Sequence, residues 1–125
     1  MTTTTSFFDI DAATEDQWAA YHLYRRLRAA EDTPDEPVLS NADFEHLVRR
    51  QWPLVETRRF IARTGDKVIG NLYLESRRKG SPDYDTFAPF IGIGGGVLHP
   101  HRRRGVGTAL LRWHAAGAAR AWPGA

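Results

Sequence analysis

The stretch Val97 to Ala109, VLHPHRRRGVGTA, reads as the end of an apolar strand, a short basic turn and the start of a helix. Gly105 and Gly107 have no Cβ, so the backbone there can approach a ligand closely. The first N–H groups of a helix have no partner inside it and carry the positive end of its dipole. Arg103 and Arg104 occupy the candidate cap positions and cannot accept these hydrogen bonds. The stretch therefore predicts an anion site suited to phosphate, the alternative being a plain strand-to-helix connection with solvated arginines.

The segment from Arg102 to Gly107, RRRGVG, resembles the Arg/Gln-x-x-Gly-x-Gly/Ala motif of the GNAT (GCN5-related N-acetyltransferase) family, with a strand before it and a helix after it. In that family the motif holds the pyrophosphate of acetyl-coenzyme A (acetyl-CoA) at a helix N-terminus. One detail departs: Pro100 lies one residue nearer to the first arginine than in many members, which shifts the alignment of Val97 to His99 by one position. The resemblance implies the following cofactor-binding residues: Val97, Leu98, Arg102, Arg103, Arg104, Gly105, Val106, Gly107 and Thr108.

Length and composition fit one soluble domain. The chain has 125 residues and a net charge of only +2. It has no cysteine, and this absence excludes disulfides and a thiol nucleophile. No apolar run reaches the length of a membrane span, and the start MTTTTSFF lacks the features of a secretory signal. We therefore expect a cytoplasmic protein without a membrane partner. Only Lys67 and Lys79 are lysines among 17 basic residues, a bias typical of a GC-rich bacterial genome.

The first half of the chain predicts a short strand and two helices. The strand covers residues 7–10, and a capping box formed by Thr14 and Gln17 starts a helix that runs to about residue 30. Ser40 and Asn41 can cap a second helix. The apolar faces of the two helices are Trp18, Tyr21, Tyr24 and Leu27 in the first, and Phe44, Leu47, Val48 and Trp52 in the second. Arg25, Arg26 and Arg28 lie beside the first stripe, where we expect them to face solvent.

The second half predicts strands at 57–63, 68–75 and 87–97, the first two forming an antiparallel hairpin. Residues 77–85 read as a polar loop, and residues 105–121 as the last helix. Its face of Val106, Leu110, Trp113 and Gly117 is expected to pack on the sheet. Three glycines at 94–96 end the third strand, and glycine in a strand marks a bulge or a close backbone approach. In the GNAT family this strand end pairs with the pantetheine arm of the coenzyme.

The order of elements predicts an α/β (α+β) fold, a GNAT-like mixed and mostly antiparallel sheet flanked by helices. We assign residues 1–5 to a flexible tail and residues 6–125 to a single GNAT-like acyltransferase domain, truncated after the coenzyme A-binding helix. The resemblance is to the N-terminal portion of the family domain, and more loosely to the first domain of tandem bacterial GNAT proteins. The full family domain continues with a strand next to this one, so the resemblance leads us to expect that residues 87–97 form an edge strand through which the chain can self-associate.

The resemblance implies an N-acyltransferase, most simply an N-acetyltransferase, which moves an acetyl group from acetyl-CoA to an amine acceptor. No catalytic residue is assigned: the strand near Ile91 and Gly92 has no carboxylate, and Glu75 is the nearest substitute for a base. The acidic loop of residues 31–37 is either a solvated linker or a wall of the acceptor site. His99 and His101 without a third ligand do not predict a metal.

Two other functions remain open. One is a truncated, non-catalytic remnant that binds coenzyme A. The other is a small nucleic-acid-binding module that uses residues 101–104, which the lack of a longer basic stripe disfavours.

Overall fold

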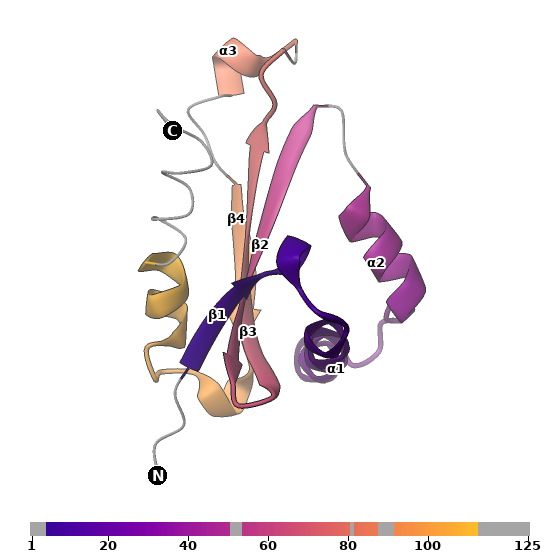
Figure 1. Cartoon of the computed structure of the whole chain (residues 1–125), viewed down its shortest axis with the longest axis vertical. Coiled ribbons are helices and arrows are strands. Elements are labelled where there is room, and N and C mark those ends of the chain that lie inside the picture. Colours follow the sequence, from indigo (N-terminus) through magenta and orange to yellow (C-terminus); the bar gives the residue numbers. More distant parts are fainter. Residues whose placement is uncertain (1–4, 51–53, 81, 88–91, 113–125) are drawn as a thin grey trace.

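The computed structural model describes residues 5–50, 54–80, 82–87 and 92–112 (Figure 1). Four strands form one antiparallel sheet in the order β1-β2-β3-β4, which confirms the predicted fold class. The elements are β1 (Thr5–Asp9), the 3₁₀ helix η1 (Ile10–Ala12), α1 (Glu15–Asp32), α2 (Asn41–Arg49), β2 (Val55–Thr64), β3 (Lys67–Arg77), α3 (Tyr84–Phe87), β4 (Gly92–Val97) and the 3₁₀ helix η2 (His99–His101). A further helical segment covers residues 106–112.

Helices cover both faces of the sheet. In Figure 1, α1 and α2 lie on one side and the segment 106–112 lies on the other. The core beneath α1 contains Trp18, Tyr21 and Tyr24 together with Ile61 of β2. The opposite core joins β2 and β3 to the helical segment and consists of Phe60, Ala62, Ile69, Leu72, Leu74, Val106 and Leu110. The alternation of Phe60 and Ile61 between these cores follows the two-residue period of a strand.

The predicted start of α1 is confirmed in detail. The Thr14 side chain accepts from the Gln17 N–H at 3.2 Å, and the Gln17 side chain accepts from the Thr14 N–H at 2.8 Å. Two predictions about the stripe were wrong. Leu27 is 37% exposed rather than in the core. Arg28 was expected to face solvent, but its guanidinium turns back onto the sheet and donates to the carbonyl oxygen of Gly95.

The second helix is capped by Ser40, whose hydroxyl accepts from the Asp43 N–H at 3.1 Å, as predicted. Phe44 and Val48 pack against the core beneath α1. Leu47, expected in the same stripe, is 39% exposed. Trp52 lies outside the described residues. Arg25, expected in solvent, stacks its guanidinium 3.9 Å from the centre of the Phe44 ring and so joins α1 to α2.

The predicted hairpin is present and longer than expected. β2 and β3 pair from Val55 opposite Arg77 to Thr64 opposite Lys67, with a bulge at Ala62 and Arg63. Gly65 takes a φ of 60° in the turn, a conformation that glycine adopts without strain. β1 starts at Thr5, opposite Thr64, so the sheet begins within the residues assigned to a tail.

The strand predicted at 87–97 is shorter within the described residues. β4 covers Gly92–Val97, while Phe87 ends the short helix α3 and residues 88–91 are not described. The predicted polar loop 77–85 therefore gives way to helix at Tyr84. Trp113 and Gly117 of the predicted last helix lie outside the described residues. None of the described helices is long and apolar enough to cross a bilayer.

Candidate functional site

The turn after β4 leads into a helix whose first donors are open. The first helical hydrogen bond runs from the Ala109 N–H to the Gly105 carbonyl at 2.9 Å, so Gly105 occupies the cap position. Gly105 has no side chain to accept from the next N–H groups. Within the described part of the chain, the N–H groups of Val106, Gly107 and Thr108 have no acceptor. Three donors at the positive end of a helix therefore face an exposed loop.

The backbone of the turn contains two residues with a positive φ. Arg103 has a φ of 63° and Gly105 a φ of 81°, while Arg102 before them is extended, with a φ of −71° and a ψ of 153°. A left-handed arginine costs on the order of 1 kcal/mol, and such strain is concentrated at functional sites.

The loop also leaves room for a ligand. A Cβ built on Gly105 or on Gly107 would meet no other atom within 4 Å. Glycine is therefore not required at these positions for packing within the described residues. The space above both backbones is open, which fits a group that must come close to the N–H donors.

Arg102 does not point into this loop. Its Nε donates to the Val97 carbonyl at 2.8 Å, and its guanidinium lies 3.7 Å from Glu31 and 3.6 Å from Asp32. The Glu31 carboxylate also accepts from the His99 N–H at 3.0 Å. Glu31 and Asp32, read from the sequence as part of an acidic loop, instead form the last turn of α1 and fasten the end of β4.

The positive charge that remains at the loop comes from Arg103, Arg104 and Lys67. Arg103 and Arg104 are exposed and have no carboxylate partner among the residues that the structure describes. Burial lowers the pKa of His101, and the charges of Lys67 and Arg104 lower it further. Lys67, from the β2–β3 turn, therefore lies near the loop, a contribution that sequence reasoning missed because 34 positions separate it from His101.

The two strand residues implied by the resemblance differ in their surroundings. The Leu98 N–H donates to the Ile69 carbonyl at 2.9 Å, and the Leu98 side chain is 2% exposed. Hydrogen-bonded and non-bonded pairs alternate in an antiparallel ladder. Val97, opposite Gly70, therefore directs its N–H away from β3, and its carbonyl on that side accepts from Arg102.

Side chains of α1 hold the glycine stretch of β4 from above. The Tyr24 hydroxyl lies 2.7 Å from the Gly96 carbonyl and 2.8 Å from the Asn71 side-chain oxygen. Arg28 donates to the Gly95 carbonyl at 3.1 Å, and a Cβ at Gly96 would lie 2.6 Å from its Cζ. Burial raises the pKa of Tyr24 to about 12, so its hydroxyl remains a donor at neutral pH. The lack of a side chain at these glycines thus lets Tyr24 and Arg28 reach the backbone of β4 and hold the strand in place.

The fold was compared with known proteins. The chain matches a tandem GNAT protein from the clavulanic acid biosynthesis pathway, with a TM-score of 0.69 over 94% of this chain and 26% sequence identity. It matches a ribosomal-protein-alanine N-acetyltransferase from Brucella melitensis biovar Abortus 2308, with a TM-score of 0.62 over 96% of the chain and 19% identity. It also matches a GCN5-related N-acetyltransferase from Kribbella flavida, with a TM-score of 0.58 over 93% of the chain and 23% identity. The chain has the GNAT fold.

The GNAT resemblance predicted from the basic glycine turn is thereby confirmed at the level of the fold. The chain spans 33% of the length of the tandem GNAT protein, 76% of the Brucella structure and 66% of the Kribbella structure. The match therefore fits an N-terminal portion of the GNAT fold. No family model matches the sequence, and the search of curated proteins found no match.

Groups that could remove a proton are sparse around the described part of this GNAT sheet. Glu75 of β3 is exposed, on the face of the sheet that α1 and α2 cover, and opposite Thr57. His99 and His101 lie in η2, and no group of three metal-ligating side chains occurs among the described residues. Sequence reasoning also missed Tyr24, Asn71 and Arg28, whose cluster forms only when α1 packs on β3 and β4.

Proposed function

We propose that this chain is an acyl-CoA-dependent N-acyltransferase that moves an acetyl group from acetyl-CoA to an amine acceptor. The observation that carries the proposal is the set of three open N–H groups at residues 106–108, beside an exposed glycine turn with positive charge. The similarity to the tandem GNAT protein supports the proposal at the level of the fold.

The residues present fit the pyrophosphate of the coenzyme. In our proposal the N–H groups of Val106, Gly107 and Thr108 bind it, and Arg103 and Arg104 supply charge. Gly105 keeps the loop open. Arg102 and Val97 act differently: Arg102 fixes the end of β4, and the outward N–H of Val97 is the donor left for the acyl-pantetheine arm. Leu98 positions this strand from the core, because its N–H is already bonded.

When bound, acetyl-CoA supplies a thioester that an amine attacks directly, forming the N–C bond, breaking the C–S bond and releasing the amine proton and the thiolate. The acceptor must arrive as a free amine or lose its proton in the site. In our proposal the Val97 N–H binds the oxygen on which negative charge develops. The general base remains unassigned in this proposal.

Calorimetric titration with acetyl-CoA tests the binding site. Gly105→Asp adds a carboxylate at the open donors, and we expect it to weaken binding by roughly tenfold or more. Gly80→Asp is the matched control, because Gly80 also has a positive φ, 97°, and open space around its Cβ position. The same strain without the same location should leave acetyl-CoA binding unchanged. Equal affinity of wild type and both variants would refute the site.

Together with a turnover assay, the titration separates the alternative functions. Binding of acetyl-CoA without turnover against a panel of amines would mark a non-catalytic coenzyme A-binding protein. Oligonucleotide binding that weakens steeply with salt would mark a nucleic-acid module.

A further inference from the structure

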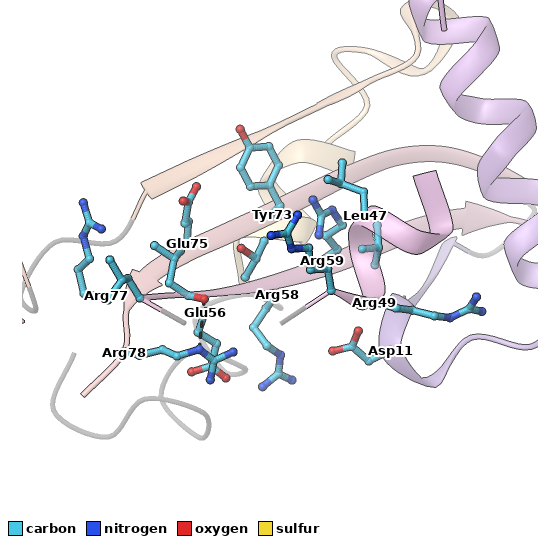
Figure 2. A pocket seen from close by; sticks show the side chains of 15 residues that line it. Asp11, Leu47, Arg49, Glu56, Arg58, Arg59, Tyr73, Glu75, Arg77 and Arg78 are labelled. Carbon is cyan, nitrogen blue, oxygen red and sulfur yellow. Dashed lines mark hydrogen bonds between the residues drawn. The ribbon is translucent and has the colours of Figure 1, made fainter. Parts of the chain in front are cut away.

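A large groove opens beside the sheet, away from the glycine turn. It has a volume of about 910 Å³ and lies between α2, η1 and the halves of β2 and β3 that extend beyond β1 (Figure 2). Its lining includes six arginines and three carboxylates, so its walls carry a net positive charge. A groove of this size and sign suits an organic anion.

Most of these arginines are already engaged by the protein. Arg58 pairs with Asp9 at 2.8 Å, Arg49 with Glu45 at 3.2 Å, and Arg77 with Asp83 at 3.5 Å. Arg78 donates to the Val55 carbonyl at 3.2 Å. These four side chains are therefore held by partners within the fold and are less available to a ligand.

Arg59 is different. It is half-buried on the floor of the groove, opposite Tyr73, and its guanidinium lies 5.9 Å from the centre of the Tyr73 ring. Figure 2 shows it between Leu47 of α2 and Tyr73. No carboxylate among the described residues lies within 4.0 Å of it. The Arg59 charge acts on the Asp11 carboxyl of the same groove without a direct ion pair: burial raises the pKa of Asp11, and Arg59 is among the groups that oppose this rise. The donors of Arg59 therefore lack a direct carboxylate partner among the described residues, and a planar carboxylate is the partner that its fork of donors fits best.

Glu75 supplies the opposite charge. It follows Tyr73 by two residues on β3, so both side chains rise from the same face of the sheet (Figure 2). Within the described residues Glu75 forms no ion pair or hydrogen bond, and it does not reach Arg59. Arg59 lies opposite Tyr73, so Arg59 and Glu75 are diagonal neighbours across β2 and β3, a spacing of roughly 7–8 Å in an antiparallel pair. The groove thus presents a cation and an anion at a spacing that a small zwitterion would bridge.

Tyr73 connects this groove to the glycine strand. A Cβ at Gly94 would overlap the ring and hydroxyl of Tyr73, so the phenol lies directly over the Gly94 backbone. Gly94 belongs to the strand along which our proposed function places the acyl arm. A molecule held between Arg59 and Glu75 would therefore lie next to that strand, where an acceptor amine is needed.

We infer that the groove binds an acceptor in which the amine stands next to a carboxylate, as in a free amino acid. Arg59 binds the carboxylate and Glu75 binds the ammonium group before it is deprotonated. The role of this molecule as acceptor rests on the proposed function, whereas its binding does not.

The test measures binding by amide chemical-shift changes in NMR, with no turnover required. The probes are L-leucine, L-leucinamide, which lacks the carboxylate, and 4-methylpentanoate, which lacks the amine. We expect L-leucine to bind roughly tenfold or more tightly than either, the loss expected for one charge-assisted contact. Arg59→Met should abolish the preference for leucine over leucinamide, and Glu75→Gln the preference over 4-methylpentanoate.

Arg63→Met is the matched control, since Arg63 lies on the same strand but outside the groove and donates to Ser6. It should leave all three affinities unchanged. Equal binding of leucine and leucinamide by the wild type, or no binding of leucine, would overturn the inference even if Arg59→Met failed to fold. Acetyl-CoA titration runs in parallel: acetyl-CoA binding without leucine binding refutes only this inference. Leucine binding without acetyl-CoA binding refutes only the proposed function.

Discussion

Three successive glycines, Gly94 to Gly96, are needed for three different reasons. Gly94 lies under the ring of Tyr73. Gly95 has a φ of 139°, and a Cβ there would overlap the backbone of β3. At Gly96 the nearest atoms belong to the end of the Arg28 side chain, which can move. The same substitution to alanine therefore meets a rigid obstacle at one position and a flexible one at the next.

We predict that Gly95→Ala lowers the free energy of unfolding by about 3 kcal/mol or more, from backbone strain and overlap combined. Gly96→Ala should cost only about 1 kcal/mol, the value of the displaced Arg28 hydrogen bond. Urea unfolding of the two variants measures the difference. A loss for Gly95→Ala no larger than that for Gly96→Ala would contradict the rigid overlap at Gly95.

At Gly107, unlike at Gly95 and Gly96, we expect a substitution to raise stability and to weaken ligand binding. It lies in the first turn of a helix with open space at its Cβ position and no positive φ. We predict that Gly107→Ala stabilises the chain by about 0.5 kcal/mol, because alanine has less conformational freedom to lose. The methyl group should weaken acetyl-CoA binding by roughly tenfold, because it occupies the approach to the N–H donors. Thermal unfolding and calorimetry on one variant check both effects, and tighter binding would contradict the proposed site.

Between elements, the contact of α1 with α2 depends on a neutral histidine. His22 is 3% exposed; its Nδ1 accepts from Arg25 Nε at 3.3 Å, and its Nε2 lies 3.2 Å from Glu45. Burial lowers the pKa of His22, Arg25 and Arg26 lower it further, and Glu45 opposes them. A second proton would have to enter at Nδ1, where it would face Arg25 and end the hydrogen bond.

Stability should therefore fall in mildly acidic solution. The unfolded chain takes up a proton at His22 near pH 6.5, while the folded chain does so only at a lower pH. The contribution of His22 is complete above about pH 6.5 and is lost as the pH falls toward the folded-state pKa. Urea unfolding at pH 8 and pH 5 measures the loss. His22→Gln should reduce the loss of stability between pH 8 and pH 5, whereas His46→Gln, at an exposed position, should leave it unchanged. An equal loss in the wild type and both variants would show that His22 is not its cause.

The elements differ in how far the sequence predicts them. The capping box at Thr14 and the hairpin around Gly65 were predictable because their signals lie within a few residues. The turns of Arg28 onto β4 and of Arg102 onto Glu31 were not, because each needs partners from elements far apart in the chain. For the same reason the sequence did not predict that Lys67 lies near the proposed anion site or that Arg59 lines the groove. Local patterns thus predicted the loop to which we assign ligand binding, but not the contacts that position it.

At the scale of the whole molecule, the proposed ligand binding and the expected self-association would use the same surface, the outer edge of β4. β4 is the last strand of the described sheet, next to β3 alone. An edge strand offers unpaired N–H and carbonyl groups to another chain. The proposed function uses the same edge for the acyl arm of acetyl-CoA. The two partners would then exclude each other.

We therefore predict that the chain self-associates at high protein concentration and that acetyl-CoA shifts it toward the monomer. Sedimentation velocity with and without acetyl-CoA measures this. At a ligand concentration about 100-fold above its Kd, binding to the monomer alone would favour that form by about 2.7 kcal/mol per chain, enough to dissociate a weak dimer. Coenzyme A lacking the acetyl group should act similarly, because our proposal pairs the pantetheine arm with the strand. Self-association that is insensitive to both ligands would mean that copies of the chain meet elsewhere, and the edge of β4 would then remain free for the acyl arm.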